Sequence, residues 1–158
     1  MTTIKIIRLL QLFSYLVVVS QLLFYLVIFS DAMKLIPLDY FLVLRKVVDT
    51  NFSIRFKSMY YACFLLTFIL VILTAKKPSS KVFITAVIAF VCLAADMAIA
   101  VRGSMPLNVQ MNQYASSSNL NWSQVREKWL LFINYRAVIG TTGFITLLCG
   151  LLVDSASK

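Results

Sequence analysis

The stretch Ser58–Val101, SMYYACFLLTFILVILTAKKPSSKVFITAVIAFVCLAADMAIAV, decides the fold. It contains two apolar runs, 58–75 and 82–101, separated by a short basic connection around KKPSSK. A helix needs about 20 predominantly apolar residues to cross the hydrocarbon core of a bilayer, and both runs approach that length. Because the connection is short, the stretch predicts an antiparallel hairpin of two membrane helices.

Two further apolar runs, about 9–30 and 130–153, flank this hairpin. Lys5 and Arg8 precede the first run, as basic residues precede the apolar part of a signal peptide. The run exceeds the roughly 7 to 15 apolar residues of a signal peptide, and no small-x-small cleavage motif follows it, so we expect a retained span. Residues 1–158 are therefore predicted to form a single membrane domain, an all-α bundle of four helices.

The composition supports a lipid environment. Apolar residues make up 61% of the chain, against roughly 45 to 50% in soluble domains. The net charge is +9, and the Lys and Arg residues lie mainly beside the apolar runs. Basic residues in such places contact anionic lipid headgroups, so membrane lipid is an expected partner and nucleic acid is not.

Two longer connections, 31–57 and 102–129, fall on the same side of the membrane if four spans are present. The first contains apolar residues at helical spacing, which predicts a short amphipathic helix on the bilayer surface or over the bundle: Leu38, Phe41, Leu44 and Val48. Arg45, Lys46 and Asp49 are expected on its other faces. In the second connection Ser123 is the expected N-cap of the last helix.

The distribution of basic residues predicts the orientation. Lys76, Lys77 and Lys81 crowd the short connection, and Lys5 and Arg8 lie near the N-terminus on the same side. Positive charge gathers in short cytoplasmic segments, so we expect a plasma (inner) membrane protein with both termini in the cytoplasm.

The chain contains no His, and its three Cys residues stand singly inside apolar runs. A His-ligated metal site or a Ser-His-Asp triad would therefore need residues from another subunit. We expect no metal and no cofactor, and we expect the cysteines to act as small apolar residues and not in disulfide-exchange chemistry.

Asp96 and Arg136 are the charged residues deepest inside predicted spans. Asp96 lies six residues before Arg102 at the end of its span, and Arg136 lies six residues after Leu130 at the start of the last. Six residues of helix rise about 9 Å, so both charges are expected at the same depth, close enough to form an ion pair. A buried charge in a membrane usually faces the bundle interior and is paired.

This pair has two interpretations, and the sequence leaves both open. It orients two helices only, or it forms the floor of a polar cavity between the first, third and fourth spans. Arg126 and Trp129 share the face of the last helix with Arg136. Gln21 and Asn108 could reach the same cavity from neighbouring segments, which makes these four residues candidate ligand contacts.

The last third of the chain carries a recognisable pattern: MPLN at 105–108, WSQVREKW at 122–129 and NYR at 134–136. This pattern resembles the anthrone-oxygenase-like family of small four-helix membrane proteins, most of which are a domain of unknown function. The N-x-P-x-N element of that family falls on Ser104 to Asn108, and its Trp and Arg fall on Trp129 and Arg136. Ser104 replaces the first Asn, and Asn134 precedes Arg136 by two residues instead of three.

The resemblance implies oxidation of a polycyclic anthrone to a quinone without metal or flavin. In that chemistry Asp96 would be the base, and Arg136 or Arg126 would stabilise the anion. Asn134 joins the candidate substrate contacts, although a shift of one residue turns a helical side chain by about 100°. The expected function is binding, with oxidation as a further step, of a hydrophobic aromatic or quinone-like compound.

The sequence is also compatible with other functions. The main alternative is a non-catalytic subunit or assembly factor that packs against a membrane partner or forms a homo-oligomer. A transporter is less favoured, because no span shows the Gly or Pro interruption typical of transporter sites.

Overall fold

The computed structural model describes residues 2–113 and 121–156, with side chains over 4–113 and 121–153. All regular elements in these ranges are helical. In chain order they are α1 (Thr2–Phe24), the π-helical turn η1 (Tyr25–Phe29), α2 (Ser30–Leu35), α3 (Leu38–Thr74), α4 (Lys81–Ile99), the π-helical turn η2 (Ala100–Ser104), α5 (Met105–Asn112) and α6 (Trp122–Ala156).

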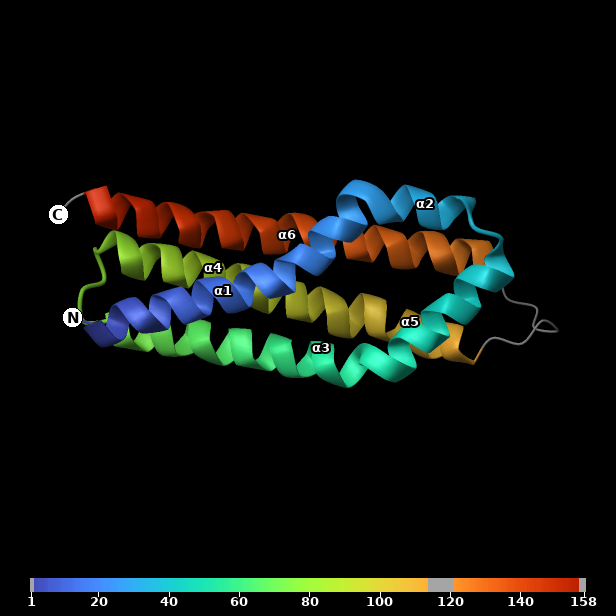
Figure 1. The fold of residues 1–158 in the computed structure, drawn as a ribbon, viewed down its shortest axis with the longest axis horizontal. Coiled ribbons are helices and arrows are strands. Elements are labelled where there is room, and N and C mark those ends of the chain that lie inside the picture. The colour runs from blue at the N-terminus through green and yellow to red at the C-terminus, as the bar shows by residue number, and fades with distance from the viewer. Residues whose placement is uncertain (1, 114–120, 157–158) are drawn as a thin grey trace.

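These elements form an elongated bundle of four rods (Figure 1). Four helical stretches are long and apolar enough to cross a membrane, so the chain is an integral membrane protein and the predicted all-α four-helix fold is confirmed. α1 begins and α6 ends at the end of the bundle that holds the α3–α4 connection, whereas α2 and α5 lie at the opposite end (Figure 1).

The spanning helices are longer than the apolar runs predicted. They cover Ile4–Leu35, Leu38–Thr74, Lys81–Asn112 and Trp122–Val153, which is 32 to 37 residues each. At 1.5 Å per residue this is about 48 to 55 Å, well beyond the roughly 30 Å of a hydrocarbon core. The excess length lies mainly toward the α2 and α5 end, where much of the two predicted connections is helical.

The expectation of a separate amphipathic helix in the first connection was wrong. That segment is the first half of α3, which runs from Leu38 to Thr74 without interruption, because the chain between them has no Gly or Pro. Pro37 fixes the start, since it forces the preceding Ile36 into an extended conformation with ψ of 133°. The predicted faces were wrong in part: Phe41 is buried as expected, but Arg45 is also buried, with 7% of its surface exposed, and Leu44 is 39% exposed.

The start of the last helix also differs from the prediction. α6 begins at Trp122, one residue before Ser123. The side-chain oxygen of Asn121 accepts a hydrogen bond from the backbone N–H of Gln124 at 3.2 Å. Asn121 is therefore the N-cap, a role that Asn fills as well as Ser.

Two apolar cores lie along the bundle. The first includes Tyr15, Val19, Cys63, Ala89 and Leu147, near the end with the short connection. The second lies near α2 and α5 and includes these residues: Met33, Phe41, Met111, Trp129 and Ile133. Along each of the four long helical stretches, a polar layer separates the residues of one core from those of the other.

Gly143 allows α6 to lie close to α1 and α4. A Cβ atom on Gly143 would collide with the hydroxyl of Tyr15 on α1 and would lie 2.9 Å from Cβ of Cys92 on α4. A Cβ atom on Gly140 would make only ordinary contacts, at 3.4 Å from Leu22 and Val19. Close approach therefore requires glycine at position 143 more than at position 140.

Candidate functional site

Two π-helical turns adjoin the polar layer. In η1 the N–H of Ser30 bonds to the carbonyl of Tyr25, and in η2 the N–H of Met105 bonds to the carbonyl of Ala100. Pro106 explains the second turn, because a proline ring clashes with the carbonyl four residues before it and a wider turn moves that carbonyl aside. Such turns are rare in proteins as a whole, but many of those that occur lie at functional sites.

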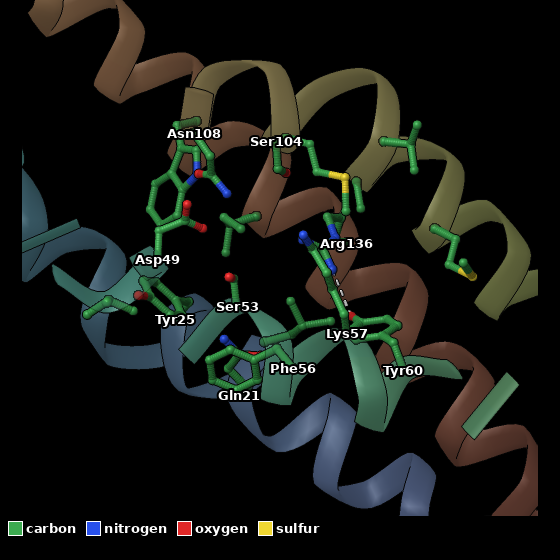
Figure 2. A pocket seen from close by; sticks show the side chains of 18 of the residues that line it. Gln21, Tyr25, Asp49, Ser53, Phe56, Lys57, Tyr60, Ser104, Asn108 and Arg136 are labelled. Atoms are coloured by element: carbon green, nitrogen blue, oxygen red, sulfur yellow. Dashed lines mark hydrogen bonds between the residues drawn. The ribbon is translucent and has the colours of Figure 1, made fainter. Parts of the chain in front are cut away.

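A cavity of about 340 Å³ occupies the polar layer. All four long helical stretches line it: Gln21, Leu22 and Tyr25 from α1 and η1; residues of α3 from Arg45 to Tyr61; residues of α4, η2 and α5 from Met97 to Val109; and Trp129, Ile133 and Arg136 from α6. Figure 2 shows Gln21, Ser53, Tyr60 and Arg136 around the same space. This volume is at the lower end of the roughly 300 to 1,000 Å³ of small-molecule sites.

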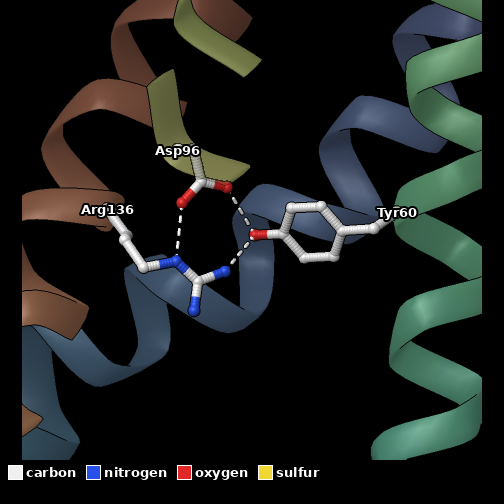
Figure 3. Close-up of polar contacts among 3 residues, drawn as sticks. All are labelled: Tyr60, Asp96 and Arg136. Carbon is white, nitrogen blue, oxygen red and sulfur yellow. Dashed lines mark hydrogen bonds and ion pairs between the residues drawn. The ribbon is translucent and has the colours of Figure 1, made fainter. Parts of the chain in front are cut away.

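Asp96, Arg136 and Tyr60 form the inner polar group of this layer (Figure 3). Arg136 Nε donates to Asp96 Oδ1 at 2.6 Å, which confirms the predicted ion pair. The Tyr60 hydroxyl donates to Asp96 Oδ2 at 2.6 Å and accepts a hydrogen bond from Arg136 Nη2 at 2.8 Å. Asp96 is fully buried, so Arg136 balances its charge and Tyr60 satisfies its second oxygen atom.

A second polar group lies nearer α2 and α5. The Arg45 guanidinium stacks on the Trp129 ring, with 4.3 Å from its central carbon to the ring centroid. Arg45 Nη2 and Trp129 Nε1 both donate to Asn108 Oδ1, at 3.0 and 2.7 Å. Three helical segments are therefore joined through one amide oxygen, and the indole of Trp129 is held in a fixed orientation.

Several hydrogen-bond donors at the cavity have no partner within the described residues. Nε of Arg45 and the hydroxyl of Ser104 are both buried and make no hydrogen bond there. Only 2% of the surface of Ser104 is exposed. Buried polar groups are normally hydrogen-bonded, and an unpaired one costs about 1 to 3 kcal/mol, so these donors call for an acceptor.

The charges around the cavity are not balanced. Arg45, Lys57 and Arg136 line it, and Asp49 is the only carboxylate among the lining residues given above. Asp96 lies behind Arg136 and adds a second negative charge. Three cations against two carboxylates leave the site positive, which favours an electron-rich or anionic guest.

Some predicted site residues meet at this cavity. Gln21, Asn108, Trp129 and Arg136 all line it. Asp96 does not line it and reaches the cavity only through Arg136 and Tyr60. A direct contact between the Asp96 carboxylate and a bound compound is therefore absent from this arrangement.

Arg126 and Asn134 lie elsewhere. Arg126 Nη1 donates to the carbonyls of Met33 and Ile36, at 3.3 and 2.9 Å, and so satisfies carbonyls at the end of α2. Asn134 Oδ1 accepts a hydrogen bond from the hydroxyl of Ser30 at 2.9 Å. Both residues join α6 to α2 and are not among the residues that line the cavity.

The contribution of α3 to the site was not predicted from the sequence. Tyr60 lies 14 residues before the end of α3 at Thr74, and Asp96 lies 15 residues after the start of α4 at Lys81, so equal depth could have identified it. Depth alone does not separate Tyr60 from Tyr61, which is 60% exposed. Arg45 was missed because its segment was expected to lie outside the bundle.

The site offers hydrogen-bond donors, cations and aromatic faces. No group of three or more Cys, Asp or Glu side chains that could hold a metal ion occurs in the described part of the chain. This arrangement can bind a planar or partly apolar compound between Tyr25, Phe56 and Trp129 and hold its oxygen atoms on Arg and Tyr donors.

Comparisons with known proteins do not identify the chain. No protein-family model, no curated protein and no solved structure matches it.

Proposed function

We propose that this protein binds a hydrophobic aromatic or quinone-like compound in the cavity of the polar layer. The cavity itself carries the proposal: about 340 Å³, bordered by aromatic side chains and by two guanidinium groups. Its position between helices that cross a membrane would let an apolar compound enter from the lipid. The Arg136 guanidinium, fixed by Asp96 and Tyr60, would hold an oxygen atom of the ring system.

Oxidation is the second step of the proposal, and it rests on the resemblance to anthrone oxygenases. An anthrone would lose one proton to become an electron-rich enolate, which the Arg136 guanidinium would stabilise. Molecular oxygen would then supply one oxygen atom to the ring carbon, and its other atom would leave as water with the two hydrogens removed from that carbon. Because Asp96 does not border the cavity, Tyr60 would pass the proton between the compound and Asp96.

Tryptophan fluorescence tests the binding step. Trp129 lines the cavity, and a quinone close to an indole quenches its emission. We expect anthraquinone to quench this emission in a saturable manner in detergent or nanodiscs. Ser53→Phe, which fills the cavity from α3, should weaken binding at least tenfold, whereas Ser58→Phe, at an exposed position outside the cavity, should not. Equal quenching in both variants would contradict the proposal.

Oxygen uptake tests the oxidation step separately. We expect the protein to consume oxygen when anthrone is added and to form anthraquinone. Tyr60→Phe should reduce this rate about 100-fold while anthraquinone still binds, because it removes only the hydroxyl that contacts Asp96. Anthraquinone binding without any oxygen uptake would restrict the function to binding.

We propose the plasma membrane, with both termini cytoplasmic, as the location. Lys5, Arg8, Lys76, Lys77 and Lys81 all belong to the end of the bundle where α1 begins and α6 ends, which supports this orientation. A C-terminal fusion to green fluorescent protein should fluoresce in bacteria, and a C-terminal fusion to alkaline phosphatase should be inactive. The opposite pair of results would reverse the orientation.

A further inference from the structure

Arg45 is a buried cation at the edge of the cavity. It makes no ion pair with a carboxylate within 4.0 Å in the described part of the chain. By contrast, the guanidinium of Arg136, whose side chain is 12% exposed, has Asp96 as its partner. The carboxylate of Asp49, one turn along α3, lines the same cavity but lies beyond ion-pair distance and accepts a hydrogen bond from Asn112 at 2.6 Å. A buried cation without a direct ion pair is costly, and a ligand that places a negative charge against it lowers that cost.

The donors beside Arg45 point to the same conclusion. Nε of Arg45 and the hydroxyl of Ser104 are buried without a partner, and both residues line the cavity. The side-chain oxygen of Asn108 is occupied by Arg45 and Trp129, and its amide nitrogen makes no hydrogen bond within the described residues. The three residues together offer a set of donors suited to an anion, and the nearby carboxylate of Asp49 is itself hydrogen-bonded to Asn112.

These three donor residues lie at a defined distance from the inner polar group around Arg136. Trp129, which carries the Arg45 guanidinium on its ring, precedes Arg136 by seven residues on α6, a rise of about 10 Å. Aromatic and apolar side chains, among them Tyr25, Phe56 and Ile133, line the cavity with these groups. A compound that uses both groups is therefore compact, apolar in its middle and polar at both ends.

We infer that Arg45, with Ser104 and Asn108, forms an anion subsite that binds the carboxylate of a compact aromatic acid. This inference rests on the proposed function and adds the chemical class of the ligand: an aromatic body with one acidic group at the end nearer α2 and α5. Arg45 is held by Trp129 and Asn108, so the subsite is formed before the ligand arrives.

Two matched probes test the subsite: anthracene-2-carboxylate and the uncharged anthracene-2-methanol, titrated by fluorescence in phosphatidylcholine nanodiscs. Partition into the bilayer is the same for every variant, so the ratio of the two affinities is compared between variants. Arg45→Gln should weaken binding of the carboxylate about tenfold and change binding of the alcohol less than twofold. Lys46→Gln, at the adjacent exposed position, should change neither.

Other outcomes overturn the inference. If Arg45→Gln weakens both probes equally, or neither, Arg45 does not recognise the acid. If that variant does not fold, Ser104→Ala decides by the same criterion, with an expected loss of about fivefold for the carboxylate alone. If neither probe binds the unmodified protein, the proposed function fails and the subsite fails with it.

A phospholipid headgroup carries similar chemistry and must be distinguished. We expect that replacing a quarter of the phosphatidylcholine by phosphatidylglycerol leaves binding of the alcohol unchanged. Phosphatidylglycerol lacks the choline cation that neutralises the phosphate of phosphatidylcholine. If it placed its phosphate on Arg45 and its chains in the cavity, it would displace the alcohol, and that displacement would overturn the assignment to a compact acid.

Discussion

At the scale of single residues, the polar layer depends on how Asp96 is held. Both of its carboxylate oxygens are hydrogen-bonded, one to Arg136 and one to Tyr60, and no part of it is exposed. A charge in this position costs about 2.5 to 3.5 kcal/mol to insert into a membrane, and only a partner of opposite charge offsets that cost. The pair is therefore expected to behave as a unit.

A double-mutant cycle tests this unit. Asp96→Asn and Arg136→Gln should each lower the free energy of unfolding by about 3 to 5 kcal/mol, because each leaves one charge buried without its partner. The double variant should be less destabilised than either single variant. Unfolding by SDS titration in mixed micelles measures all four proteins, and simple additivity of the two effects would contradict the account.

Removal of the Tyr60 hydroxyl is a smaller change to the same polar group than removal of a charge. Tyr60→Phe removes a hydroxyl that donates to Asp96 and accepts from Arg136, and should cost about 1 to 3 kcal/mol of unfolding free energy. Tyr61→Phe is the control, since Tyr61 is 60% exposed and its loss should stay within about 0.5 kcal/mol. Equal effects of the two variants would show that the hydroxyl of Tyr60 contributes nothing special.

The sequence predicted part of this layer. Equal depth in adjacent helices was enough to pair Asp96 with Arg136, because charges in membrane spans need partners. Equal depth did not predict the partners of Arg126 and Asn134, because these partners depend on how the chain runs from Ser30 onward. Every residue has a backbone carbonyl group, so the sequence does not indicate which carbonyl a side chain will contact. Contacts of this kind are identified only from the structure.

At the scale of elements, α3 is a helix that extends well beyond its apolar run. Its first half contains Lys, Arg and Asp residues, and the apolar run that marks the span begins only at Ser58. Hydropathy therefore predicted a connection followed by a span, although nothing between Leu38 and Thr74 interrupts a helix. The continuous helix extends beyond the apolar run and brings Arg45 and Asp49 to the cavity.

Proline substitution tests the continuity of α3. Thr50 lies on the exposed side of the helix, between the two segments that were predicted to be separate. Thr50→Pro should lower the free energy of unfolding by about 3 kcal/mol, because proline removes a helical hydrogen bond and clashes with the preceding turn. Thr50→Ala should have little effect. Tolerance of proline at this position would indicate a flexible connection in place of the helix.

Two glycines of α6 form a matched pair. Gly143→Ala should lower the free energy of unfolding by about 1 to 3 kcal/mol, because the new Cβ collides with Tyr15 and approaches Cys92. Gly140→Ala should be neutral or slightly stabilising, since its Cβ meets only ordinary contacts and alanine favours helix by about 1 kcal/mol. Thermal unfolding in detergent distinguishes the two, and the reverse order would contradict the packing described.

At the scale of the whole molecule, the bundle is asymmetric. One end holds the short basic connection and an apolar core around Tyr15 and Ala89, and the other end holds long helical extensions and a second core around Trp129. The cavity lies between the cores, where the two π-helical turns adjoin it. The sequence predicted the asymmetry from its charges and loop lengths, but not the second core, which requires the extensions to be helical.

Native mass spectrometry of the protein, extracted gently from its membrane, shows whether the cavity holds a small molecule. We expect the unmodified protein to retain a compact aromatic compound, and we expect Ser53→Phe, but not Ser58→Phe, to lose it because the added ring fills the cavity. The same empty mass for all three proteins, or a stable membrane partner in place of a small molecule, would contradict the account.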